Sequence, residues 1–244
     1  MLKIWDATNF RRTVGGLCLI LAPLLHFAGE RLAPSNTGTA SDWLAAASQD
    51  SGRNVESIIL ILVSGILMIP ALFAIAHVVR GRGVILAHIG VGVTLVAVVL
   101  DTFVGAGANL MVAVMGSAGL DSGAMTGLIQ KSLIAPSVVS TPTFIGFFLQ
   151  LPGYFLIGLA VWRSGFGYRW AGPLVSLWVV AAFFPNPVQS DILEFVIDAL
   201  GVVALGAIGY RVLALKDTVW ESASTASGRP SDTSVPNAQP VAGD

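Results

Sequence analysis

The sequence has few charged residues and almost no cysteine. Only 11% of its residues are charged, whereas soluble domains carry about 25%, so the deficit indicates lipid as the solvent around much of the chain. The net charge of −1 provides no basic patch of the kind that nucleic acid binding requires. The single cysteine, Cys18, cannot form an internal disulfide. We therefore expect a lipid bilayer, and no nucleic acid, as partner.

The common catalytic signatures are absent as well. The sequence contains no Walker A motif, no HExxH, no GxSxG and no CxxC. The usual sequence patterns of P-loop nucleotide-binding proteins, zinc proteases and serine hydrolases are therefore missing. An enzyme with an unfamiliar site is not excluded by these absences, and the sequence indicates no particular cofactor.

What the sequence does contain is a series of long apolar runs. It is 55% hydrophobic, with a mean hydropathy of +0.79, and a membrane-crossing helix needs about 20 mostly apolar residues. We therefore predict an all-α, polytopic transmembrane bundle over residues 1–216. Its six spans, of which the fifth is short, are expected at 13–31, 56–79, 84–108, 142–162, 170–185 and 190–213, and the third could continue helically toward Gly116.

The basic residues predict the orientation of the bundle, because cytoplasmic loops carry an excess of lysine and arginine. Alternate loops of the predicted topology hold only Arg31, Arg53 and Lys131, beside several acids. We therefore predict that both termini lie in the cytoplasm of a bacterial-type cytoplasmic membrane. The basic residues that would face the cytoplasm are Lys3, Arg11, Arg12, Arg80, Arg82, Arg163, Arg169, Arg211 and Lys216.

Two long external loops and a polar tail complete the predicted layout. SDWLAAASQD, with Ser41 as a helix cap, and MTGLIQKSLIAP each predict a short helix at the membrane surface. Such helices either cover an external site or simply cover helix ends. The tail from 217 to 244 is rich in Ser, Thr, Pro, Ala and Gly, so it is predicted to be a disordered cytoplasmic segment.

Three acids stand at the start of the last apolar run, at Asp191, Glu194 and Asp198. At 3.6 residues per turn they share an arc of about 60° on one helix face. Ionisable groups inside a bilayer are costly and by default are functional candidates. Asp198 is expected ~12 Å below the external end of its helix, close to the midplane of a ~30 Å core.

Polar residues of three other spans fall at similar depth. The same rise per residue places Asp101, His26 and Gln150 in the external half of the membrane. The sequence therefore predicts a candidate polar cavity built from Asp198, Asp101, Glu194, His26 and Gln150.

Three interpretations of these polar residues remain open. The carboxylates and His26 form a protonatable or cation-binding pocket, since clustered and buried carboxylates take up protons more readily. Alternatively, His26 and Glu30, spaced i and i+4 on one helix face, contribute to a metal site. In the third interpretation, Asp191 and Glu194 only complement the positive end of the helix dipole, while a hydrogen bond to a neighbouring helix satisfies Asp198 and Asp101.

These interpretations lead to different functions. The first favours a small permease-like or accessory protein with a protonatable cavity facing the outside. The alternative is a membrane-embedded metal-dependent or redox enzyme that acts on a lipid or a quinone. A structural membrane protein without a site is the third possibility. The substrate and the oligomeric state do not follow from the sequence.

The order of the N-terminal segments resembles that of a known group of proteins. GGLCLILAPLLHFAGE (15–30) precedes a polar loop with DWLAAASQDSGRNVE (42–56), and the second apolar run ends in HVVRGRG (77–83), before a glycine-rich third run. This layout resembles uncharacterised bacterial six-span membrane proteins of a domain-of-unknown-function family, over roughly the first hundred residues. The resemblance implies a six-span fold, and neither an activity nor a site residue.

Overall fold

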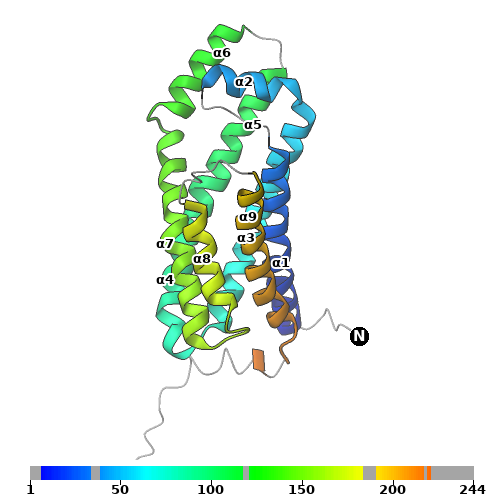
Figure 1. Cartoon of the computed structure of the whole chain (residues 1–244), viewed down its shortest axis with the longest axis vertical. Helices are drawn as coiled ribbons and strands as arrows, with labels where there is room; N and C mark the ends of the chain where they lie inside the picture. The colour runs from blue at the N-terminus through cyan, green and yellow to red at the C-terminus, as the bar shows by residue number, and fades with distance from the viewer. Residues whose placement is uncertain (1–6, 34–38, 118–120, 184–190, 217–218, 221–244) are drawn as a thin grey trace, which may run out of the picture.

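The chain folds into a bundle of long helices that run side by side (Figure 1). The computed structural model describes residues 7–33, 39–117, 121–183, 191–216 and 219–220. Within these ranges every regular element is helical and no strand is present. The predicted all-α fold therefore holds for the described part of the chain.

Five helices are long and apolar enough to cross a membrane, which agrees with the predicted multi-pass transmembrane fold. They are α1 (Ala7–Leu32), α3 (Ser51–Val78), a continuous helix from Gly81 to Gly116, α7 (Ser140–Ser164) and α9 (Asp191–Leu213).

The fifth predicted span is shorter than a bilayer crossing. It corresponds to α8 (Ala171–Phe183), whose 13 residues give a helix about 20 Å long against a core of about 30 Å. The end of the predicted span, residues 184–185, lies outside the described residues. Within the described residues α8 therefore does not reach across a membrane core.

The third long helix is built from four pieces. It begins with η1 (Gly81–Gly83) and α4 (Val84–Ala97), passes through the π-helical turn η2 (Val98–Phe103), and ends with α5 (Val104–Ser117). Its 36 residues make it about 54 Å long at ~1.5 Å per residue. It therefore continues past residue 108 to Gly116, the longer of the two extents that the sequence left open.

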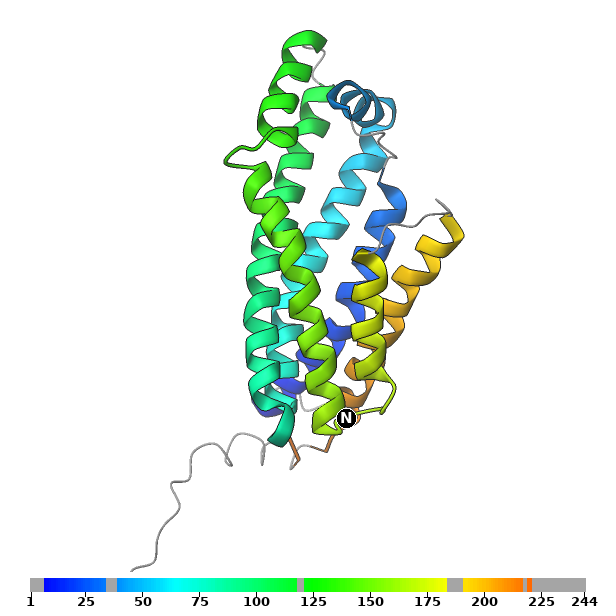
Figure 2. The ribbon, with the colours of Figure 1, turned by 60° about the vertical axis from the view of Figure 1, so that its left-hand side comes forward.

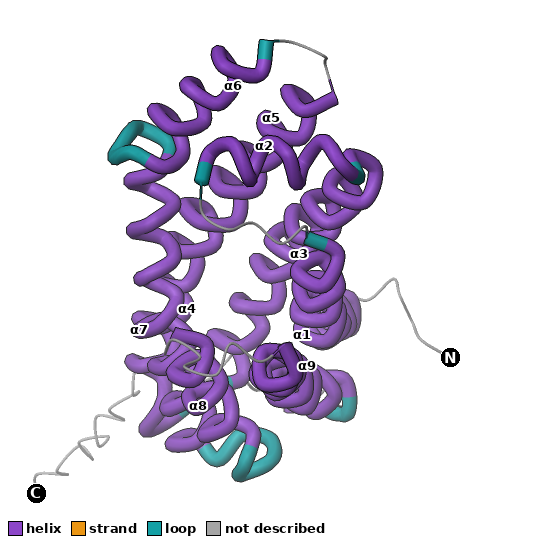
Figure 3. Tube along the Cα trace, turned by 45° about the horizontal axis from the view of Figure 1, so that its top comes forward, coloured by secondary structure: helices purple, strands orange, loops and turns teal. Residues whose placement is uncertain are grey.

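The upper part of α5 and the two segments predicted to be external loops form a cap on the bundle. α2 (Ala40–Gln49) lies crosswise to the long helices, and α6 (Ser122–Ile129) continues into the π-helical turn η3 (Gln130–Ile134) (Figures 1 and 3). The cap has a small apolar core of its own, made by Ala40, Leu44, Ala47, Val112, Met125 and Ile129. We call this end of the molecule the cap end.

Both predicted surface helices therefore exist, but the predicted cap of the first is wrong. Thr39, and not Ser41, is the N-cap residue of α2, and its side chain accepts a hydrogen bond from the Asp42 backbone N–H. Serine and threonine cap equally well in principle, so the choice depends on where the chain turns into the helix.

The opposite end of the bundle brings the two ends of the helical domain together. The Arg12 guanidinium donates a hydrogen bond to the Leu215 carbonyl, so the start of α1 lies beside the end of α9. The His77 ring, at the end of α3, packs on Trp220 with ring centroids 4.2 Å apart. Trp220 belongs to the predicted disordered tail, yet it is buried in the main apolar core; the tail from 221 onward lies outside the described residues.

Charges divide sharply between the two ends. Within the described residues, the acids lie in the half of the molecule toward the cap end: Glu30, Asp42, Asp50, Glu56, Asp101, Asp121, Asp191, Glu194 and Asp198. We call the other end the basic end, because it carries Arg11, Arg12, Arg80, Arg82, Arg163, Arg169, Arg211 and Lys216.

Small residues bring the helices into close contact. A Cβ atom on Gly209 would lie 2.7 Å from the Gly16 carbonyl oxygen, and one on Gly172 would lie 2.6 Å from the Gly158 carbonyl oxygen. The pairs α1–α9 and α7–α8 therefore pack backbone against backbone, as is common for helices in membranes.

Candidate functional site

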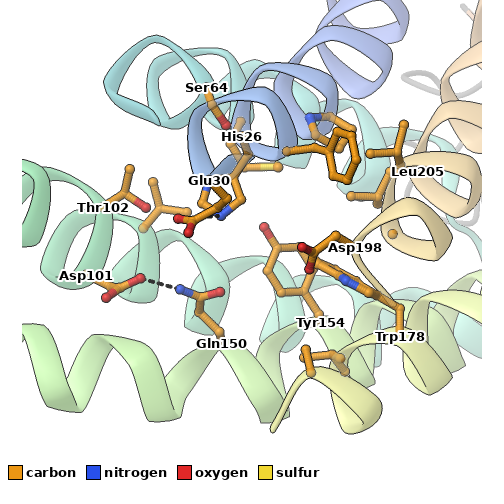
Figure 4. Close-up of a pocket in the computed structure, with 18 of the residues that line it drawn as sticks. His26, Glu30, Ser64, Asp101, Thr102, Gln150, Tyr154, Trp178, Asp198 and Leu205 are labelled. Atoms are coloured by element: carbon orange, nitrogen blue, oxygen red, sulfur yellow. Dashed lines mark hydrogen bonds and ion pairs between the residues drawn. The ribbon is translucent and has the colours of Figure 1, made fainter. Parts of the chain in front are cut away.

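The helices enclose a cavity of about 440 Å³ in the half of the bundle toward the cap end (Figure 4). Its lining comes from α1, α3, η2, α7, α8 and α9. The polar side chains among the lining residues are His26, Glu30, Ser64, Asp101, Thr102, Gln150, Tyr154, Trp178 and Asp198.

Four of the five residues predicted for a polar cavity line this space. His26 comes from α1, Asp101 from η2, Gln150 from α7 and Asp198 from α9. Glu194 is not among the lining residues and is exposed one turn earlier on α9. The structure thus brings polar groups from four separate segments together and leaves Glu194 outside.

Asp101 is held by a neighbouring helix. The Gln150 side chain donates a hydrogen bond from Nε2 to Asp101 Oδ2 at 2.5 Å (Figure 4). α7 can come this close because residue 146 is glycine: a Cβ there would lie 2.5 Å from the Asp101 backbone nitrogen. Asp101 also lies in the π-helical turn η2, and such turns inside α-helices are frequent at functional sites.

Asp198 is held by an ion pair that the sequence did not predict. The Arg31 Nη2 atom donates to Asp198 Oδ2 at 2.7 Å, and the two side chains are 34% and 31% exposed. The Arg31 guanidinium also lies 5.8 Å from the centre of the Phe27 ring. The Arg31 guanidinium therefore compensates the negative charge of Asp198 at the edge of the cavity.

His26 and Glu30 lie side by side on α1. His26 Nε2 is 3.9 Å from Glu30 Oε1, as their i, i+4 spacing predicts. A zinc site needs at least three protein ligands. In the part of the chain that the structure describes, no group of three His, Cys, Asp or Glu side chains is placed to hold a metal ion.

Two aromatic residues of the site were missed by the sequence analysis. Tyr154 is 5% exposed, and its hydroxyl points into the cavity (Figure 4). Trp178 meets it edge to face, with ring centroids 5.1 Å apart at 68°. The spacing of Tyr154 four residues after Gln150 was a usable signal, because residues at i and i+4 share a helix face.

Trp178 lies where it does because its neighbour on α9 is a glycine. A Cβ atom on Gly201 would approach the indole ring to 2.5 Å. The ring of Trp178 therefore fits directly against the α9 backbone. Phe27, Phe147 and Phe183 add further aromatic surface to the lining.

The site as a whole is acidic and aromatic. Three carboxylates, those of Glu30, Asp101 and Asp198, line the cavity, and one guanidinium, that of Arg31, is bonded at its edge. Charges in a region of low dielectric interact strongly. The cavity is therefore chemically suited to attract a cation or a proton.

A second cavity of about 640 Å³ adjoins the first on the side of the cap. It lies between α5, η3 and α7, with Trp43 of α2 in its wall, and is lined mainly by apolar residues. Asp101 and Phe147 line both cavities. These two side chains therefore stand between the two spaces.

No protein family, no curated protein and no solved structure matches the chain. The resemblance to six-span proteins of a domain-of-unknown-function family stays a prediction.

Proposed function

We propose that this chain is a six-span, permease-like protein of a bacterial-type cytoplasmic membrane, which takes up a small molecule or an ion from the outside into its central cavity. The observation that carries the proposal is the cavity itself. Polar and ionisable side chains that would be costly in contact with lipid line this common space. Such groups inside membrane proteins mark substrate and ion pathways.

The distribution of charge supports the orientation. The basic end has the excess of arginine and lysine that is typical of cytoplasmic loops. It supports an orientation with the start of α1 and the end of α9 in the cytoplasm and the cap outside.

The course of the chain supports a sixth crossing. A Cβ atom on Gly167, just after α7, would lie 3.8 Å from Arg211 Cγ near the end of α9. Both α7 and α9 therefore end at the basic end, and the chain must return toward the cap end between them. α8 packs against both helices; we propose that α8 belongs to this return.

The exposure of the α1 residues supports access from outside. The side chains of His26 and Glu30 are 43% and 47% exposed, and both lie in the last turns of α1, toward the cap end. A solute that enters on this side reaches the carboxylates before it meets the apolar core near the basic end, which contains Leu72, Ile75 and Val161.

The test uses the single cysteine of the chain. Because Cys18 is the single cysteine, Cys18→Ala provides a cysteine-free background. Cys18 is also buried, with 5% of its surface exposed. Ala182→Cys then places a thiol in the cavity wall. Leu177→Cys is the matched control, because Leu177 lies on the same helix, is 57% exposed and does not line the cavity.

A membrane-impermeant maleimide is added to intact cells and to permeabilised cells. We expect Ala182→Cys to be labelled in intact cells and Leu177→Cys to remain unlabelled in both, because lipid covers it. If Ala182→Cys is labelled only after permeabilisation, or not at all, the cavity is not open to the outside and the proposed function is wrong.

A further inference from the structure

The carboxylates of the cavity are only partly compensated. Arg31 is bonded to Asp198. Asp101 accepts a hydrogen bond from the neutral amide of Gln150, and within the described residues it forms no ion pair. Glu30 faces the His26 ring at 3.9 Å. A ligand that enters this space and displaces water must therefore compensate negative charge, because an unpaired charge in low dielectric is costly.

A second, independent observation is the hydroxyl of Tyr154. The side chain is 5% exposed and its hydroxyl points into the cavity (Figure 4). Among the described residues no hydrogen-bond partner is found for it, although buried tyrosine hydroxyls usually have one. The hydroxyl is therefore available to water or to a ligand in the cavity.

The aromatic walls specify the kind of cation. Tyr154 and Trp178 meet edge to face, and both line the same cavity as the carboxylates. Ring faces attract cations within about 6 Å, and tryptophan does so best. Hard metal ions prefer a cage of oxygen ligands instead, which these rings do not provide. The combination suits an organic cation.

The second cavity indicates the chemistry of the rest of the ligand. It shares Asp101 and Phe147 with the first and is otherwise mainly apolar, with Leu133, Ile134 and Phe144 in its walls. Cavities of about 300 to 1,000 Å³ are typical of small-molecule sites, and both spaces fall within this range. An apolar substituent can therefore occupy the second space while the charge stays near Asp101.

We infer that the cavity binds an amphiphilic organic cation, with its positive centre between Asp101 and the rings of Tyr154 and Trp178 and its apolar body toward the second cavity. This inference rests on the proposed function, since it names the substrate class of the same site.

Two probes of matched shape test the inference. Tetraphenylphosphonium and tetraphenylborate carry the same four phenyl groups and opposite charges. Binding of each to the purified full-length protein in nanodiscs is measured by equilibrium dialysis, with empty nanodiscs as the reference for partition into lipid. We expect saturable binding of tetraphenylphosphonium and no saturable binding of tetraphenylborate.

Three variants locate the bound cation. Asp101→Asn should weaken tetraphenylphosphonium binding at least ten-fold, because a desolvated charge pair is lost. Trp178→Leu should weaken it between about two-fold and thirty-fold, the range of cation–π contacts. Glu194→Gln is the matched control: it removes one carboxylate from α9 outside the cavity, and binding should stay within two-fold of the wild type. Each variant is first compared with the wild type in melting temperature, so that a folding defect is recognised.

The following results would overturn the inference or the proposed function. Absence of saturable tetraphenylphosphonium binding, equal binding of tetraphenylborate, or an equal loss in folded Asp101→Asn and Glu194→Gln would overturn the inference. If Ala182→Cys is labelled from outside and tetraphenylphosphonium does not bind, the substrate class is wrong and the open cavity stands. If Ala182→Cys is not labelled from outside, the proposed function fails, whatever the probes show.

Discussion

Gly201→Ala probes the contact that positions Trp178 in the cavity wall. The added Cβ would lie 2.5 Å from the indole ring, whereas ordinary contact begins at 3.4 Å, so the ring must move by almost 1 Å. Trp178 cannot move freely, because it packs on the buried Tyr154. Overpacking of this kind costs about 1–3 kcal/mol.

The control for this variant is Gly206→Ala, on the same helix. A Cβ atom on Gly206 meets nothing within 4 Å, so this variant changes helix propensity alone, by about 1 kcal/mol in favour of alanine. The propensity gain is common to both variants, so the difference between them isolates the contact with Trp178.

The assay is the apparent melting temperature of the purified variants in one detergent. For a chain of this size 1 kcal/mol corresponds to about 2–4 °C, so Gly201→Ala should melt roughly 2–12 °C below Gly206→Ala. Equal melting temperatures, or a more stable Gly201→Ala, would refute the reasoning that α9 and Trp178 are in direct contact.

Three further predictions follow. Gly146→Ala places a Cβ 2.5 Å from the Asp101 backbone nitrogen, so its melting temperature should fall several degrees below that of Gly107→Ala, whose Cβ meets nothing within 4 Å; equal values would contradict the close approach of α7 to η2. Thr94→Val should leave stability unchanged or raise it by about 1 kcal/mol, because the fully buried Thr94 hydroxyl has no partner within the described residues; clear destabilisation would reveal one. In the cysteine-free background, an impermeant maleimide should label Ser48→Cys on α2 in intact cells and Ser234→Cys only after permeabilisation, and the reverse pattern would invert the topology.

The long helices could be predicted from the sequence because their apolar length is matched to the bilayer. The ends of these helices were harder to predict where packing against other elements determines them. The sequence left two extents open for the third long helix; it takes the longer one, from Gly81 to Gly116, and its upper part packs against α2 within the cap. The π-helical turn at Asp101 has no clear sequence pattern, and neither has the close approach of α7 to it at Gly146.

The depth of the polar residues was also predictable, from the rise per residue. Whether these side chains face one another could not be predicted, because packing sets the rotation of each helix about its axis. The pairing of Arg31 with Asp198 joins residues 167 positions apart, which no local pattern reveals.

Glu194 shows where the same argument fails. It shares a helix face with Asp198, so it was included in the predicted cavity. In the structure the residues from 192 to 196 are all exposed, and the start of α9 leans away from α8 (Figure 2). Glu194 therefore lies outside the cavity, on an exposed turn at the start of α9.

The central claim, that α9 presents Asp198 to the cavity, is tested most directly by a cysteine scan of this helix from 195 to 205 in the Cys18→Ala background. The cavity-lining positions on α9 are Asp198, Gly201, Val202 and Leu205, which follow the helical spacing i, i+3, i+4 and i+7. We predict that the rate of reaction with an impermeant thiol reagent peaks at Asp198 and Val202, since Gly201 packs on the Trp178 ring and Leu205 is 1% exposed. The rate should be low at Val196 and Val203, which are 45% and 53% exposed on the outer face of the bundle. Equal rates along the helix, or peaks at Val196 and Val203, would contradict the account.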